Sequence, residues 1–206
     1  MILRCSIALF LLEFIAQGVV VDRIAIIVGQ RAVKTSDIEN EARIKPLLNG
    51  DPLDLQTAAL RQAAERLIDQ AVIRREIELG GYASSPSEDV DRFFDNIRKQ
   101  RFKTDAAYQQ ALTQYGIAEA QLKRKLAWQL TVLNFIERRF RPGVLVTNED
   151  VERYFKQHYP PAVPLESVRK KIEDQIAGDR VNELFERWLG ETRTQLKPEY
   201  VAGAIE

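Results

Sequence analysis

The first apolar run of the chain predicts a buried β-strand. Residues 22–28 are rich in isoleucine and valine and alternate poorly with polar residues, which is typical of a strand that is covered on both faces. Residues 29–31 have the composition of a turn. Ser36 is followed three positions later by Glu39, the spacing of a capping box, so a helix is predicted to begin at this point.

Most of the following chain repeats apolar residues at helical spacing. The first predicted helix runs from about Asp37 and is interrupted at Pro46. A second helix is predicted to be capped by Asp51, with Pro52 at its first position, where proline is favoured. Gly80 is expected to end this helix, as a glycine commonly does.

Four further helical segments are predicted before the only proline-dense stretch. One follows a capping box at residues 85–88, and a short one occupies residues 104–116. A long helix is predicted over residues 118–140, where leucines recur every three or four positions. The next short helix is expected to begin at Thr147 and to run through Phe155.

The C-terminal part of the chain predicts one long helix and a second strand. Residues 158–164 form a proline-rich linker, and a long helix follows them until Lys197 and Pro198. Residues 199–201 are extended in character and could pair with residues 22–28, because a lone strand has unpaired edges. The sequence therefore predicts a mainly α fold with a small two-stranded sheet made by the N- and C-terminal segments.

The first 18 residues have the pattern of a secretory signal peptide. Residues 1–4 are short and positively charged, residues 6–16 are apolar, and small residues stand at Ala16 and Gly18. We expect cleavage after Gly18 and a periplasmic location. Glu13 within the apolar stretch is unfavourable for membrane entry, so an uncleaved anchor or a misplaced start of the sequence is the alternative.

Composition narrows the classes of partner. Cleavage would remove Cys5, which is the only cysteine, and a mature chain without thiols suits an oxidising periplasm. The full chain carries 30 basic and 30 acidic residues. This balance argues against nucleic acid as a partner and against electrostatic binding to a membrane surface. The length suffices for one sizeable core, with or without a projecting arm.

Four stretches of the chain, taken in order, resemble the N-terminal chaperone domain of the SurA family. Residues 21–39 resemble its strand, turn and helix, and residues 63–97 resemble its "RLID" helix and the junction that follows. Residues 111–130 resemble a hairpin of that domain, and residues 167–201 resemble its closing helix and strand. The match depends on the order and joint presence of these stretches, because each one is mostly ordinary helical sequence.

The resemblance implies a particular domain organisation. Residues 19–157 would form a SurA-like chaperone domain with a projecting helical arm at about residues 82–143. Residues 158–164 would be the linker, and residues 165–206 would complete the same domain.

The chain departs from the family where catalysis would be expected. SurA-like and PrsA-like proteins usually carry one or more parvulin-type prolyl isomerase domains before the final helix. Here residues 144–157 are followed almost directly by Pro164, so no such domain fits. His158, the only histidine, lies in the proline-rich linker, and no convergent group of catalytic or metal-ligating residues is evident. We therefore expect no enzymatic activity, no cofactor and no bound metal.

Aromatic residues of the middle helices are the candidate client-binding site. In the family this region projects as an arm and helps to line a crevice for clients, and exposed apolar surface is what a holding chaperone needs. The alternative is that the same side chains pack the helices against one another. The candidates are Phe93, Phe94, Phe102, Tyr108, Tyr115 and Trp128.

Two classes of function follow from these observations. The first is an ATP-independent periplasmic holdase for unfolded envelope proteins, with outer-membrane β-barrel chains as the clients implied by the resemblance. The second is a structural or adaptor module that docks one folded envelope partner. Residual prolyl isomerase activity is a third and unexpected alternative. Because few residues follow Gln157 before the last helix, that helix could also complete a neighbouring molecule in a domain-swapped homodimer.

Overall fold

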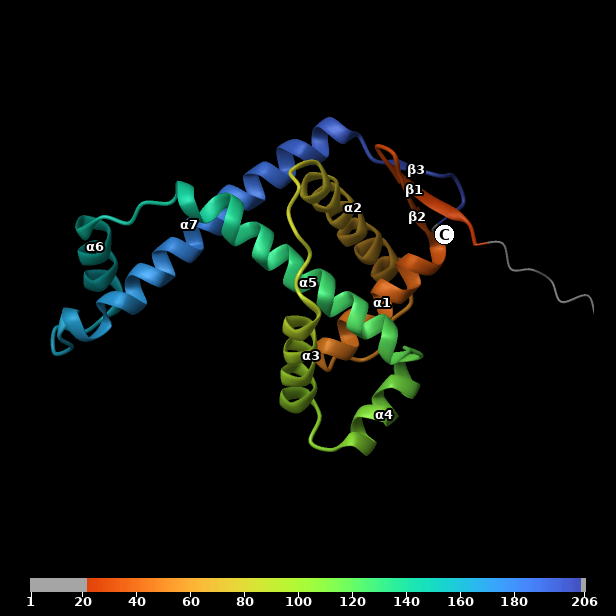
Figure 1. Cartoon of the computed structure of the whole chain (residues 1–206), viewed down its shortest axis with the longest axis horizontal. Helices are drawn as coiled ribbons and strands as arrows, with labels where there is room; N and C mark the ends of the chain where they lie inside the picture. The colour runs from red at the N-terminus through yellow and green to blue at the C-terminus, as the bar shows by residue number, and fades with distance from the viewer. Residues whose placement is uncertain (1–21, 205–206) are drawn as a thin grey trace, which may run out of the picture.

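The computed structural model describes residues 22–204 and is mainly helical, with a small antiparallel sheet near the ends of the described chain (Figure 1). The predicted signal peptide, residues 1–18, lies outside the described residues. The elements in chain order are β1 (Ile24–Val28), β2 (Arg31–Lys34), α1 (Thr35–Asn49), α2 (Thr57–Leu79), α3 (Ser87–Arg101), α4 (Asp105–Tyr115), α5 (Glu119–Phe140), a 3-10 turn η1 (Arg141–Gly143), α6 (Asn148–His158), α7 (Leu165–Leu196) and β3 (Glu199–Tyr200).

The sheet joins the two ends of the described chain, as the sequence predicts, but it has three strands and not two. Its order is β2-β1-β3, and Ile26 of β1 pairs with Tyr200 of β3. The additional strand arises because Gly29 adopts a left-handed φ of 59°, which lets the chain reverse tightly into a hairpin. Arg31, expected to be the last residue of the turn, therefore begins β2, and residues 31–34 extend alongside β1.

Local hydrogen bonds shift two predicted helix starts. The backbone N–H of Lys34 donates to the Asp37 carboxylate at 3.0 Å, so α1 begins at Thr35 and Ser36 is not its cap. Ser85 is likewise not a cap, because its hydroxyl accepts a hydrogen bond from the Asn134 side chain of α5 at 3.1 Å. Helix α3 starts one residue later than predicted, at Ser87, with Pro86 before its first turn.

The expected break at Pro46 and the expected helix start at Asp51 are both wrong. Helix α1 continues through Pro46 to Asn49, and Gly50 ends it with a left-handed φ of 79°. The Asp51 carbonyl accepts a hydrogen bond from the Tyr115 hydroxyl at 2.5 Å, and residues 51–55 form a connection without regular secondary structure. Helix α2 starts at Thr57.

Several later elements confirm the sequence pattern. Helix α4 is capped by the Thr104 hydroxyl, which accepts from the Ala107 N–H at 3.1 Å, and it ends at Gly116. Helix α6 begins with the predicted capping box of Thr147 and Asp150. Helices α5 and α7 run as long continuous elements.

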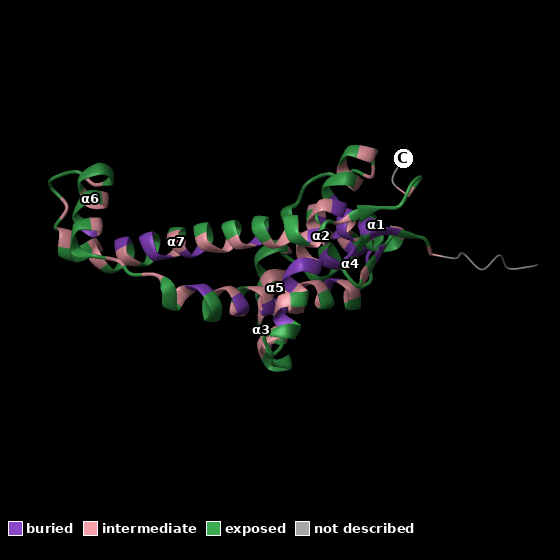
Figure 2. Ribbon diagram, turned by 90° about the horizontal axis from the view of Figure 1, so that it is seen from above, coloured by how far each residue is buried: buried purple, intermediate pink, exposed green. Residues whose placement is uncertain are grey.

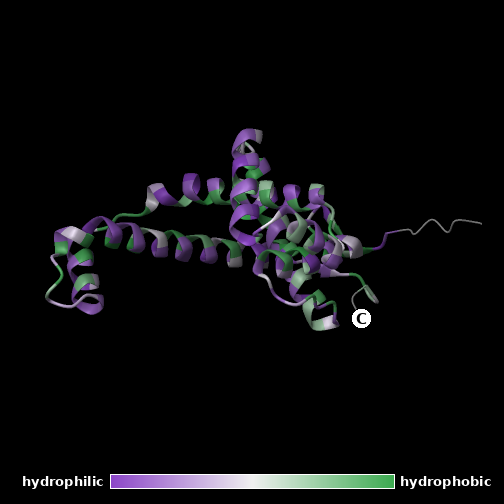
Figure 3. Cartoon of the chain, turned by 90° about the horizontal axis from the view of Figure 1, so that it is seen from below, coloured by the Kyte–Doolittle hydropathy of each residue, from purple (hydrophilic) through white to green (hydrophobic). Residues whose placement is uncertain are grey.

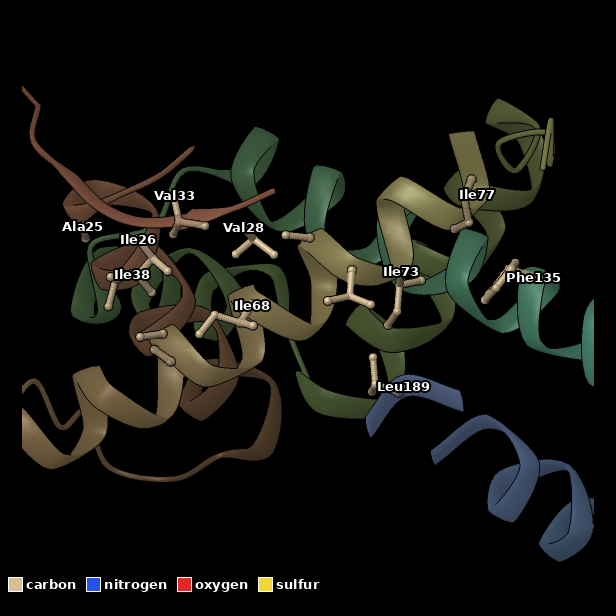
Figure 4. Close-up of a cluster of buried hydrophobic side chains, with 14 of the residues drawn as sticks. Ala25, Ile26, Val28, Val33, Ile38, Ile68, Ile73, Ile77, Phe135 and Leu189 are labelled. Atoms are coloured by element: carbon tan, nitrogen blue, oxygen red, sulfur yellow. The ribbon is translucent and has the colours of Figure 1, made fainter. Parts of the chain in front are cut away.

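The main core lies between the sheet and helices α1, α2, α5 and α7 (Figure 4). Ile26, Ile68 and Phe135 are 0–1 % exposed. The Phe135 ring meets the Trp188 ring of α7 at a centroid distance of 5.6 Å, which fixes the crossing of α5 and α7 through aromatic packing. Buried residues concentrate where α2, α5 and α7 meet, and exposed residues prevail towards α6 (Figure 2).

A second core holds α3 and α4 against the body of the molecule. Ile44 and Leu47 of α1 pack with Phe94, Tyr108 and Leu126 in this second core. The segment that the sequence predicts as a projecting arm, residues 82–143, is therefore anchored to α1 over much of its length.

Helix α6 and the first half of α7 extend beyond the end of α5 (Figures 1 and 2). Val151 of α6 packs on Ile172 and Ile176 of α7 in a small third core. The predicted linker at residues 158–164 is the connection within this helical hairpin. Hydrophilic residues cover much of the outward sides of its helices (Figure 3).

The C-terminal end of α7 and the strand that follows it are held against α2 of the same chain. The Arg193 guanidinium pairs with Asp69 of α2 at 2.9 Å and also with Glu65. The Tyr200 hydroxyl donates to the Glu65 carboxylate. Burial and this bond raise the pKa of Tyr200 to about 12. Among the described residues, no helix is long and apolar enough to cross a membrane.

The α6–α7 hairpin should loosen in acid. The Asp150 carboxylate accepts from Arg180 of α7 at 2.8 Å and from the Thr147 N–H at 3.1 Å, and these bonds hold its pKa far below the ordinary value of 3.8. Because the pKa is lower in the folded state, the carboxylate stabilises the hairpin above pH 3.8, and this contribution is lost as the pH falls below that value.

We expect the NMR amide signals of α6 to change below pH 3.8 before those of α2 do. The variant Asp150→Asn should weaken α6 at neutral pH and lose this acid transition. An unchanged midpoint for α6 in Asp150→Asn would contradict the assignment.

Candidate peptide-binding groove

An open groove of about 580 Å³ lies between the main core and the second core. Helices α1, α2, α3, α5 and α7 all contribute to its walls, and we call it the central groove. Apolar side chains from α2, α3, α5 and α7 contribute to its lining. These apolar side chains include Ile73, Ile97, Leu126, Val132, Phe185 and Leu189.

A buried ionic bridge forms one wall of the central groove. Glu41 of α1 has a side chain that is only 6 % exposed, and its carboxylate pairs with Lys125 of α5 at 2.6 Å and with Arg66 of α2 at 3.1 Å. Both carboxylate oxygens are thus satisfied by cations. This bridge ties three helices together at the level of the groove.

The two ends of the groove differ in charge. Lys45 of α1 and Arg101 of α3 are exposed beside Leu48 and Ile97 at one end. Arg101 donates to the carbonyl of Asn49, the last residue of α1, at 3.3 Å. This bond positions the guanidinium at the groove mouth.

Carboxylates mark the other end, where α7 crosses α2. Asp69 and Glu186 line the groove there beside Phe185. Burial raises the pKa of the Asp69 carboxyl above its ordinary value, while the nearby Arg193 guanidinium acts in the opposite direction. The groove therefore combines an apolar floor with a cationic end and an acidic end, which suits non-covalent binding of an amphipathic segment.

The structure removes three of the six predicted client-binding aromatics from the surface. Phe94, Tyr108 and Tyr115 are 2 %, 1 % and 8 % exposed, because they fill the second core. The Tyr108 hydroxyl donates to Glu119 at 3.2 Å, and burial together with this carboxylate raises the pKa of Tyr108. In this conformation these three rings hold helices together, which is the alternative role considered for them, and they offer no surface to a client.

The other three aromatics are partly exposed but lie outside the central groove. Phe93 and Phe102 pack at the edge of the second core. Trp128 lies on α5 with the Arg74 guanidinium 4.1 Å above its ring, a cation–π contact. It lines a second hollow of about 560 Å³ near Tyr82. The six predicted residues are thus divided between two cores and do not form one surface.

The only histidine of the sequence, His158, makes packing and hydrogen-bond contacts within α6. The His158 ring at the end of α6 stacks on Tyr154 at a centroid distance of 4.0 Å, and its Nδ1 lies 2.8 Å from the Tyr154 carbonyl oxygen. Within residues 22–204, no group of three or more histidine, cysteine or acidic side chains is arranged to hold a metal ion.

The sequence patterns used for prediction missed the groove residues. A usable signal exists for Glu41, because it lies between Ile38 and Ile44 on the buried face of α1, where an unpaired charge is unfavourable. A carboxylate on such a face predicts a cationic partner on another helix. No comparable signal identifies Lys45 or Arg101, since exposed cations on helices are common.

Replacement of Glu41 by glutamine should strongly destabilise the fold. The substitution keeps the shape of the side chain but leaves Lys125, which is 13 % exposed, without a carboxylate. Loss of one partner of a largely buried ion pair should lower the free energy of unfolding by about 3 kcal/mol. Urea unfolding of Glu41→Gln measures this loss, with Glu39→Gln on the exposed face of α1 as the matched control, expected within about 0.5 kcal/mol of the parent. Equal losses in the two variants would contradict the bridge.

Comparison with known proteins assigns no family to this chain. The chain matches no protein-family model and no curated protein sequence.

Proposed function

We propose that this protein is an ATP-independent periplasmic holdase that binds unfolded envelope proteins, including outer-membrane β-barrel chains. The observation that carries the proposal is the central groove, which presents apolar side chains from several helices beside unburied charges. Its volume of about 580 Å³ accommodates several side chains of an extended segment. A holdase needs such a surface because it covers apolar segments without strict selection of their sequence.

The sequence resemblance supports the same proposal. The SurA-like stretches at residues 21–39 and 167–201 include the two strands that pair in the sheet, β1 and β3. The signal peptide predicted at residues 1–18 would direct the chain out of the cytoplasm. We propose no isomerase activity, because residues 144–164 leave no room for a parvulin-type domain.

Suppression of aggregation tests the proposal directly. The chain purified from the periplasm, added in molar excess to a urea-denatured outer-membrane β-barrel protein at the moment of dilution, should reduce light scattering. Val132→Asn places a polar group in the groove wall and should weaken client binding about fivefold, which corresponds to about 1 kcal/mol of lost apolar contact.

The matched control for this experiment is the neighbouring residue on α5. Leu133 is 52 % exposed and lies outside the central groove, so Leu133→Asn should leave activity unchanged. Thermal unfolding must show that both variants are folded at the assay temperature. No suppression by the parent chain, or capture of one folded envelope protein without binding of unfolded chains, would overturn the holdase proposal and favour an adaptor.

A further inference from the structure

The charges of the central groove are segregated along its length. Its cationic half contains Lys45, Arg66, Arg101 and Lys125 with the single carboxylate of Glu41. The other end, where α7 crosses α2, contains Glu186 and Asp69, and the Asp69 carboxylate is already paired with Arg193 at 2.9 Å. The groove thus has an apolar floor between an end that carries free cations and an end that carries a free carboxylate.

The charges at the two mouths are available to a ligand. Among the ion pairs of residues 22–204, none involves Lys45, Arg101 or Glu186, and all three residues are exposed. Such side chains remain hydrated until a partner of opposite charge arrives. The cations of the groove wall, Arg66 and Lys125, are already paired with Glu41 and contribute a weaker net field.

The spacing of the lining residues sets the length of the ligand. Lys125 and Val132 both line the groove from α5, and seven residues of α-helix span about 10 Å. An extended chain advances about 3.3 Å per residue, so about three residues cover the apolar floor. The flanking residues of the bound segment then lie at the charged mouths.

We propose that the central groove binds extended segments of about three apolar residues that carry an acidic residue at one end and a basic residue at the other. The acidic residue lies against Lys45 and Arg101, and the basic residue lies against Glu186, the carboxylate of that end that forms no ion pair within residues 22–204. This inference rests on the proposed holdase function and defines the class of segment that the groove takes. The charges orient the segment, while the apolar floor supplies most of the affinity.

The test uses three fluorescent peptides with blocked termini and the same Leu-Phe-Leu centre. One is flanked by glutamate and lysine, one by two glutamates, and one by two lysines. Fluorescence anisotropy with the full chain should show the mixed-charge peptide binding about fivefold more tightly than either of the others, because exposed ion pairs each change affinity only a few-fold.

Charge reversal makes the test specific for the assigned end. The double variant Lys45→Glu with Arg101→Glu should lose the preference for the mixed-charge peptide and should bind the doubly basic peptide about fivefold more tightly than the mixed one. The matched control is Arg61→Glu with Lys99→Glu, two exposed cations on α2 and α3 that do not line the groove. This control should keep the order of affinities of the parent chain.

The outcomes separate this inference from the function on which it rests. Equal binding of all three peptides would overturn the charge selection and leave the holdase function standing. Binding of no peptide, together with no suppression of aggregation, would overturn both. If the control variant also lost the preference for the mixed-charge peptide, that preference would come from the overall charge of the chain. This result would overturn the proposal that Lys45 and Arg101 select the peptide.

Discussion

The arrangement of the helices depends on the carboxylate of Glu41, which is buried and shared between Arg66 and Lys125. A buried charge is tolerated only when opposite charges satisfy it. Helices α1, α2 and α5 must therefore meet at this point, and the side chains around it cannot close into a continuous apolar core. The main core and the second core form on either side of the bridge, and the central groove lies between them.

The return of α7 completes the groove. Phe135 and Trp188 fix the crossing of α5 and α7 through ring packing, and Arg193 attaches the last turns of α7 to the carboxylates of α2. This crossing places Phe185, Glu186 and Leu189 of α7 at the acidic end of the groove. The pairing of β3 with β1 then ties the two ends of the described chain together, so the fold that creates the groove is closed by its own C-terminal segment.

Local sequence signals predicted most elements but not how they pack. Helical periodicity identified α5 and α7, and the capping residues Thr104 and Thr147 marked real helix starts. Asp51 was expected to cap α2, but the helix begins at Thr57, and the Asp51 carbonyl accepts a hydrogen bond from the distant Tyr115. Periodicity tells which face of a helix is apolar but not which helix covers that face. Phe94 and Tyr108 were therefore expected at a client surface, although they fill a core.

Hydrogen–deuterium exchange with and without an unfolded client tests most directly whether the central groove is the binding surface. An unfolded outer-membrane β-barrel chain should slow exchange in the segments that line the groove, around Lys45 in α1, Gln129 in α5 and Phe185 in α7. Exchange in α6 and in β2 should be unchanged. Protection confined to the α6–α7 hairpin or to the sheet, with none along the groove, would contradict the account.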